Sequence, residues 1–138
     1  MATGVTETRE QSTTTPAATH GVVHVELPAK DAEKLWAFYS GVFGWKFEAM
    51  PGMETYKAAM PEGQDGVGFA IYQRDQPDQA LTNYISVESI SAYAEKIEQH
   101  GGKLLHRFSV PGMGHGAITH DPEGNVLGIW QTDPNAKE

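Results

Sequence analysis

The chain has 138 residues, no cysteine, and 18 acidic against 10 basic side chains, which gives a formal net charge of −8. The length fits one domain with a real core, and the lack of cysteine excludes disulfides, a thiolate nucleophile and Cys-ligated zinc, so a cytoplasmic location is expected. No Lys and Arg cluster marks a nucleic-acid-binding face, no apolar run approaches the roughly 20 residues that span a bilayer, and the acidity favours cationic partners.

Both ends of the chain are polar. Residues 1–20 are rich in Thr, Glu, Ala and Gln and have almost no large apolar side chain to bury. Such a segment does not recover its ordering entropy, so we expect a flexible N-terminal tail. Residues 133–138 are expected to form a short C-terminal tail for the same reason.

The first unit begins with residues 22–27 (VVHVEL), a β-branched run that ends at a proline and is typical of a strand. Asp31 is the expected N-cap of a helix that runs to about Ser40, with apolar residues at helical spacing and glycines after them. Pro-Gly and Pro-Glu-Gly turns then separate three short strands, at 45–50, 55–60 and 67–72.

The second half repeats this order of elements. A strand is expected at 83–87, and Ser89 caps a helix that ends at Gly101-Gly102. Three further strands follow, at 103–110, 115–120 and 125–131. The sequence therefore predicts a single α+β domain of two βαβββ modules, about 21–74 and 80–132, each a largely antiparallel sheet with its helix on one face.

Two stretches carry a family resemblance. One is His24 to Asp31, followed by residues 36–45 (WAFYSGVFGW); the other is the turn at 121–125 (DPEGN), preceded by Gly-Gly-Lys at the end of the second helix. Together they resemble the small two-module members of the glyoxalase, bleomycin-resistance and extradiol-dioxygenase (vicinal oxygen chelate) superfamily. The resemblance implies cupped, mostly antiparallel sheets around a central cavity, into which the first and last strand of each module present metal ligands.

The aromatic residues of the first stretch are expected to be structural. Phe38, Tyr39, Phe43 and Trp45 are predicted to pack in the core where the helix meets the sheet, and Gly44 to allow a tight turn there.

Only one of the four metal-ligand positions that the resemblance implies is occupied by a residue that can bind a metal. His24 lies seven residues before Asp31, where the first ligand is expected, but the others fall at or near Phe69, on Thr82 and on Gly128. A tight site needs at least three converging protein donors, so no cofactor is predicted. The alternative is a divalent metal held by noncanonical ligands.

A second position opposes one activity of the superfamily. The resemblance places a basic residue four positions after the first ligand in enzymes that grip the glutathione carboxylate, and this chain has Pro28 there. Proline offers neither a charge nor a backbone N–H. A glutathione-dependent glyoxalase I is therefore not expected.

Strand alternation places His24 and Glu26 on one face, where they are candidates for proton transfer, although a structural pair fits equally well. His115, in a glycine-rich stretch, is a third candidate for a general acid or base, against an ordinary solvated histidine. The predicted ligand-binding residues that line the cavity are Phe69, Ile71, Tyr84 and Trp130.

The leading hypothesis is a protein that binds a small, partly apolar molecule in this cavity without the superfamily metal. The alternative is a lyase, isomerase or dioxygenase of the same superfamily that uses a metal through noncanonical ligands, and a structural or regulatory role is a third. A homodimer is expected, because cupped sheets leave edges and apolar faces to cover. Neither nucleic acid nor a membrane is an expected partner.

Overall fold

The computed structural model describes residues 20–60 and 66–137. The predicted tail at 1–19 lies outside the described residues. No helix in the described ranges is long and apolar enough to cross a membrane.

The described residues form the predicted βαβββ order twice. The first module contains β1 (Val22–Ala29), α1 (Ala32–Phe43), β2 (Glu48–Met50), β3 (Met53–Ala59) and β4 (Gly68–Gln73). The second contains β5 (Thr82–Ser86), α2 (Ile90–Gln99), β6 (Lys103–Val110), β7 (Gly114–His120) and β8 (Val126–Thr132). This confirms the α+β class and the two modules.

Both helices begin where their capping residues predict. The Asp31 side chain accepts a hydrogen bond from the backbone N–H of Lys34, and Ser89 accepts one from Ala92, so each cap satisfies an N–H group that has no partner within the helix. Helix α1 ends at Phe43, because Gly44 adopts a left-handed conformation with φ of 72° and returns its N–H to Ser40.

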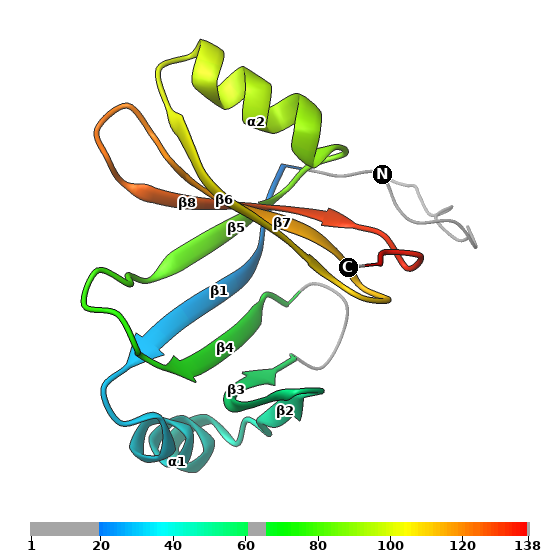
Figure 1. Cartoon of the computed structure of the whole chain (residues 1–138). Coiled ribbons are helices and arrows are strands. Elements are labelled where there is room, and N and C mark those ends of the chain that lie inside the picture. The colour runs from blue at the N-terminus through cyan, green and yellow to red at the C-terminus, as the bar shows by residue number, and fades with distance from the viewer. Residues whose placement is uncertain (1–19, 61–65, 138) are drawn as a thin grey trace, which may run out of the picture.

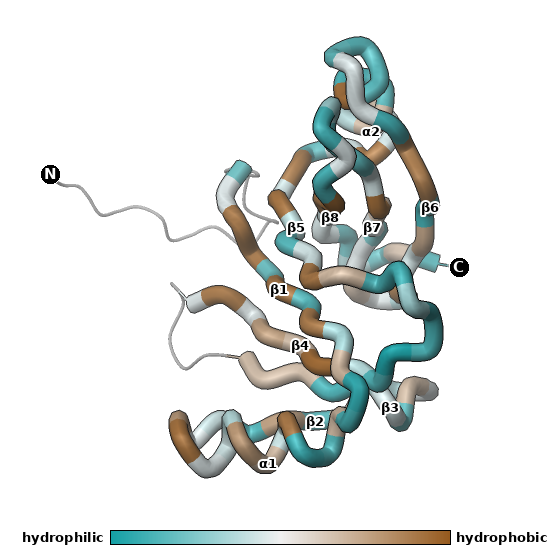
Figure 2. Tube along the Cα trace, turned by 90° about the vertical axis from the view of Figure 1, so that its left-hand side faces the viewer, coloured by the Kyte–Doolittle hydropathy of each residue, from teal (hydrophilic) through white to brown (hydrophobic). Residues whose placement is uncertain are grey.

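The eight strands form one continuous sheet in the order β2-β3-β4-β1-β5-β8-β7-β6. The pairs β1–β4 and β5–β8 are parallel, and the other neighbours are antiparallel. The modules join through β1 and β5, so the two first strands lie side by side at the centre. The sheet curls, with α1 and α2 outside it at opposite ends (Figure 1), and the view turned by 90° shows the same separation (Figure 2).

The apolar core lies between the sheet and the helices, in two clusters. Ile90 of α2 packs on Val87, Ala117 and Ile129, and Ala32 of α1 packs on Ala29 and Ile71. Both clusters occupy the outer, helix-facing side of the sheet. The inner, concave face is therefore free to carry polar and aromatic side chains.

Two aromatic residues predicted for the core are instead exposed. Phe38 is 54% and Phe43 58% exposed, whereas Tyr39 and Trp45 are partly buried and stack on each other with ring centroids 5.7 Å apart. Phe38 lies away from the side of α1 that faces the sheet. Phe43, in the last turn, stacks on Tyr39 and Trp45 with centroids 6.1 and 5.3 Å apart, but most of its ring faces outward. The prediction of a core position is wrong for these two residues.

The predicted C-terminal tail is packed over most of its length. The backbone N–H of Asp133 donates to Met113, the carbonyl of Ala136 accepts from Gly112, and Ala136 is buried. These backbone bonds hold residues 133–136 against the β6–β7 turn, which corrects the expectation of a free end.

Candidate functional site

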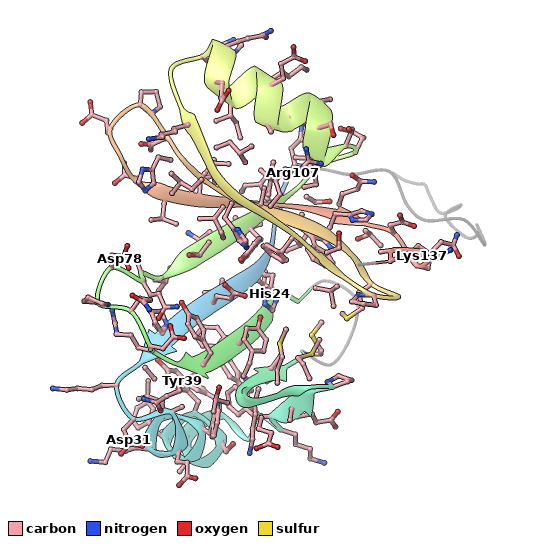
Figure 3. All side chains as sticks on the ribbon, viewed as in Figure 1. His24, Asp31, Tyr39, Asp78, Arg107 and Lys137 are labelled. Carbon is pink, nitrogen blue, oxygen red and sulfur yellow. The ribbon has the colours of Figure 1, made fainter. Side chains whose placement is uncertain are left out.

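The centre of the concave face carries the two polar side chains of β1. In the register of the sheet, His24 lies opposite Gly68 of β4 and Tyr84 of β5, and Glu26 lies opposite Ala70 and Thr82. Side chains alternate between the two faces of a strand, so these positions share the concave side. Figure 3 shows His24 near the middle of the molecule, between the two halves of the curled sheet.

Hydrogen bonds join His24, Tyr56, Glu26 and Tyr84 into one group, here called the carboxylate network. The Tyr56 hydroxyl donates to Glu26 Oε2 at 2.8 Å, and the Tyr84 hydroxyl donates to Glu26 Oε1 at 3.0 Å. His24 Nε2 lies 2.9 Å from the same Tyr56 oxygen. A phenol has one hydrogen, which Tyr56 gives to Glu26, so His24 Nε2 carries a proton and donates it to Tyr56.

Burial governs the titration of the network. It lowers the pKa of His24 and raises that of Glu26, while the hydrogen bonds from Tyr56 and Tyr84 pull the pKa of Glu26 back down. Burial and then the Glu26 charge raise the pKa of both tyrosines. The tyrosines therefore remain protonated donors to the carboxylate, and His24 favours its neutral form.

The shifted pKa of His24 predicts a pH dependence of stability. Its pKa is lowered from the ordinary value of 6.5, so the unfolded chain binds the proton first as the pH falls below 6.5, and the free energy of unfolding decreases. Glu26 acts in the opposite sense, because its raised pKa lets the native state bind a proton first as the pH falls. We expect the free energy of unfolding of His24→Gln to decrease less than that of the wild type as the pH falls. Urea unfolding between pH 5 and 8 measures the difference.

The matched control is His106→Gln, which removes an exposed imidazole of β6 outside the carboxylate network and so separates an effect specific to His24 from the loss of any histidine. A profile for His24→Gln that parallels the wild type would contradict a buried, neutral His24.

Glycines on the concave face allow rings to lie flat against the sheet. A Cβ atom at Gly128 would lie 2.5 Å from Tyr84 Cδ2, and one at Gly114 would lie 2.6 Å from the Trp130 ring. Phe108 covers Gly116 in the same way and meets Tyr84 edge-on, with ring centroids 6.4 Å apart. The second module thus contributes an aromatic surface beside the carboxylate network.

A cleft of about 820 Å³ opens next to the network, between the β2–β3 hairpin and the segment that follows β4. Its wall includes Tyr56 and Tyr72, whose rings stack with centroids 6.0 Å apart. The further lining relevant to ligand chemistry is Met50, Met53, Glu54, Gln73, Asp75 and Gln79. Among the described residues, this lining contains two carboxylates and no Lys or Arg, and we call it the acidic cleft.

Tyr56 connects the acidic cleft with the carboxylate network, since its ring lines the cleft and its hydroxyl bonds Glu26. Sequence reasoning did not find Tyr56. It lies 30 residues from Glu26 on a strand separated from β1 by β4, and only the register of three strands brings the two together. An aromatic residue in a predicted strand gave no specific signal.

The structure brings together three of the predicted site residues, His24, Glu26 and Tyr84. Trp130 shares their face, because it covers Gly114 on the same side on which Phe108 covers Gly116. Its indole N–H donates to Thr132 Oγ1, and it lies outside the lining of the acidic cleft.

Phe69 and Ile71 lie on the opposite face, which corrects the expectation that they line the cavity. Ile71 is fully buried beneath α1 with Ala29 and Ala32, and the Phe69 ring packs on Trp45 at 5.1 Å. Register explains the difference: Gly68, Ala70 and Tyr72 share the concave side, and an error of one residue in a strand moves every side chain to the other face.

His115 also lies away from the carboxylate network. It lies in β7, and its ring nitrogens bond Ser109 and Asp133. Its neighbour Gly116 faces Phe108 on the concave side, so alternation turns His115 to the outer side of the sheet.

The four implied ligand positions do not fit a divalent metal. Within the described ranges, no three His, Cys, Asp or Glu side chains gather where they could hold a metal ion. Thr82 Oγ1 donates to the carbonyl of Ala80, His24 Nε2 is engaged with Tyr56, and the Tyr84 ring covers Gly128. The donors that remain are one imidazole nitrogen and a carboxylate already bound by two phenols.

Comparison with known proteins agrees with the fold. The family model of the Glyoxalase/Bleomycin resistance protein/Dioxygenase superfamily matches residues 21–129. The chain therefore belongs to this superfamily, which confirms the resemblance in the sequence.

Three relatives illustrate the range of similar proteins. A glyoxylase-like domain-containing protein of Didymella fabae is 32% identical over 120 residues, which cover 80% of this chain and 93% of that protein. The putative glyoxylase CFP32 of Mycobacterium tuberculosis and the anthracycline biosynthesis protein DnrV of Streptomyces peucetius are each 26% identical, over 79% and 77% of this chain. The chain spans only 44% and 45% of their lengths.

Solved structures show the same fold at low identity. Methylmalonyl-CoA epimerase from Mycobacterium tuberculosis matches with a TM-score of 0.62 and 12% identity, over 91% of this chain and 95% of the epimerase. A hypothetical protein, BH1468, from Bacillus halodurans also has a TM-score of 0.62, with 13% identity over 86% of this chain and 98% of its own.

Proposed function

We propose that this chain binds a small organic cation with a flat, apolar body in the acidic cleft, without a bound metal. The observation that carries the proposal is the hydrogen bond from Tyr56, whose ring lines a cleft with two further acids, to Glu26, a partly buried carboxylate directly behind that ring. A buried charge is costly unless it is paired and hydrogen-bonded. In the described part of the chain, the ion pairs join His20 to Glu88 and His115 to Asp133, and neither involves Glu26.

The hydrogen bonds of the network support a role for Glu26 as the counter-ion. Two phenols donate to its oxygens and satisfy it partly, but a phenol supplies no opposite charge. A protonated amine near Glu26 would supply that charge, and the carboxylates of Glu54 and Asp75 in the cleft wall favour the same sign of ligand. The net charge of −8 adds a long-range attraction for cations.

The lining also supports an apolar ligand body. The faces of Tyr56 and Tyr72 attract cations and planar rings, and Met50 and Met53 offer adaptable apolar surface. The volume of about 820 Å³ is within the usual range of ligand cavities. The name of DnrV refers to anthracycline biosynthesis, and the likeness to that protein supports a flat, partly apolar ligand for the present chain.

The test compares two probes of nearly equal shape, 1-naphthylmethylamine and 1-naphthylmethanol, by isothermal titration calorimetry at pH 7. We expect the amine to bind at least about tenfold more tightly. Glu26→Gln should lower the affinity for the amine by roughly 30-fold or more, since losing one partner of a buried charge pair costs about 2–5 kcal/mol. The same substitution should leave the affinity for the alcohol nearly unchanged.

Glu48→Gln, an exposed acid on β2, is the control that removes the same charge outside the cleft. Equal affinity for the amine and the alcohol, or a Glu26→Gln variant that binds the amine like the wild type, would reject the organic cation as ligand.

A further inference from the structure

A second group of reactive side chains lies on the outer side of the sheet, formed by β6, β7 and the segment after β8. Ser109 and His115 are paired across β6 and β7, and Ser109 Oγ lies 2.8 Å from His115 Nδ1. His115 Nε2 lies 3.0 Å from Asp133 Oδ2. The group therefore has the order hydroxyl, imidazole, carboxylate that activates a serine in many enzymes, although Nδ1 faces the serine and Nε2 the carboxylate, the reverse of the usual triad.

The hydrogen bonds place the protons as that chemistry requires. Asp133 is an acceptor, and the bond from His115 lowers its pKa, so His115 Nε2 carries a hydrogen. The other nitrogen, Nδ1, is then free to accept the hydrogen of Ser109 Oγ. In this tautomer His115 is oriented to remove a proton from the serine.

A hollow of about 340 Å³ lies directly at Ser109 and His115, and its other lining residues are Ile90, Arg107 and Phe108. Arg107 Nη2 donates to Ser91 Oγ in the first turn of α2, which fixes the guanidinium beside the N-terminal end of that helix. Figure 3 shows Arg107 between α2 and the sheet. A guanidinium and a helix N-terminus both stabilise negative charge that develops nearby.

We propose that Ser109, His115 and Asp133 form a nucleophilic site that hydrolyses small carboxylic esters bound in this hollow. Ser109 Oγ attacks the ester carbonyl and passes its proton to His115 Nδ1, while Arg107 stabilises the carbonyl oxygen as it becomes negative. The C–O bond to the alcohol then breaks, and His115 returns the proton to the leaving alkoxide. Water, deprotonated by His115, releases the acid from the acyl-serine and regenerates the hydroxyl.

The geometry gives a reagent access to the site. The side chains of His115 and Asp133 are 28% and 32% exposed, and the hollow opens on the surface away from the acidic cleft. The site lies on the opposite face from the carboxylate network, so the proposed ester hydrolysis does not depend on the organic-cation proposal.

The experiment is covalent labelling of the full chain with a fluorophosphonate, followed by peptide mass spectrometry, together with hydrolysis of p-nitrophenyl acetate. We expect one label per chain, on Ser109, and none on Ser109→Ala. His115→Gln and Asp133→Asn should slow labelling and hydrolysis by at least about 100-fold. This expected loss of rate is smaller than the one that such substitutions cause in efficient serine hydrolases.

Two controls separate this site from nonspecific chemistry. His120→Gln removes another imidazole from β7, and Ser40→Ala removes a hydroxyl from α1; both should react like the wild type. Labelling of the wild type at other serines, no labelling at all, or equal ester hydrolysis by Ser109→Ala would overturn the proposal. Because the wild type alone reports which serine is labelled, a variant that fails to fold leaves the test intact.

Discussion

Replacing Gly128 by glutamate, which restores a metal ligand at the position implied by the superfamily, is expected to destabilise the domain by about 3 kcal/mol or more and to create no metal site. A Cβ atom at this position would lie 2.5 to 2.8 Å from three atoms of the Tyr84 ring. The ring cannot move aside without losing its hydrogen bond to Glu26. The new carboxylate would also enter the face that already holds Glu26.

Urea unfolding measures the loss, and Gly41→Glu is the matched control. Gly41 lies in α1, and apart from its chain neighbours and the nearby helix backbone no atom of the described residues lies within 4 Å of an added Cβ. Replacing a helical glycine typically stabilises by roughly 0.5–1 kcal/mol. A Gly128→Glu variant as stable as the wild type, or one that gains a tightly bound divalent ion, would show that Tyr84 does not block the ligand position.

Shortening Ile71 to alanine is expected to cost about 2–5 kcal/mol of stability, the usual range for a fully buried aliphatic side chain, and to leave ligand affinity unchanged. Ile71 packs beneath α1, on the face opposite the acidic cleft. The two measurements are the urea midpoint and the affinity for 1-naphthylmethylamine under conditions where the variant is folded.

Leu81→Ala is the control for stability, since Leu81 is 49% exposed and its truncation should change the unfolding free energy by no more than about 0.5 kcal/mol. If the folded Ile71→Ala variant binds the amine more weakly and keeps its stability, Ile71 lines the ligand-binding cavity.

Local signals in the sequence predicted the order of elements well. Asp31 and Ser89 marked the helix starts, and Pro-Gly turns marked the strand ends, because capping and turn formation depend on neighbouring residues only. The parallel pairs β1–β4 and β5–β8 and the junction of β1 with β5 depend on contacts between distant segments, so local patterns did not specify them.

Local patterns likewise predicted only the part of the candidate site that lies on one strand. His24 and Glu26 share a strand, and alternation alone places them on one face. Tyr56 joins them only through the registers of β3, β4 and β1. The prediction placed Phe69 on the concave face, but Ala70 occupies that side. An error of one residue in β4 decides whether Phe69 or Ala70 points into the cavity.

Position 128, where the superfamily resemblance implies a ligand, has a structural role in this chain. Glycine at position 128 provides the space in which the Tyr84 ring lies, and Tyr84 in turn donates to Glu26. Glycine at this position therefore supports the hydrogen-bonded carboxylate. In the proposed function, this carboxylate supplies the negative charge that recognises the ligand.

Whether the acidic cleft binds its ligand without a metal is tested by a calorimetric titration of 1-naphthylmethylamine into protein that has been dialysed against a strong chelator. We predict one binding site per chain with the same affinity before and after chelation, and no change when a divalent ion is added back. Binding that disappears after chelation and returns with a stoichiometric divalent ion would contradict metal-independent binding and show that the site needs a metal.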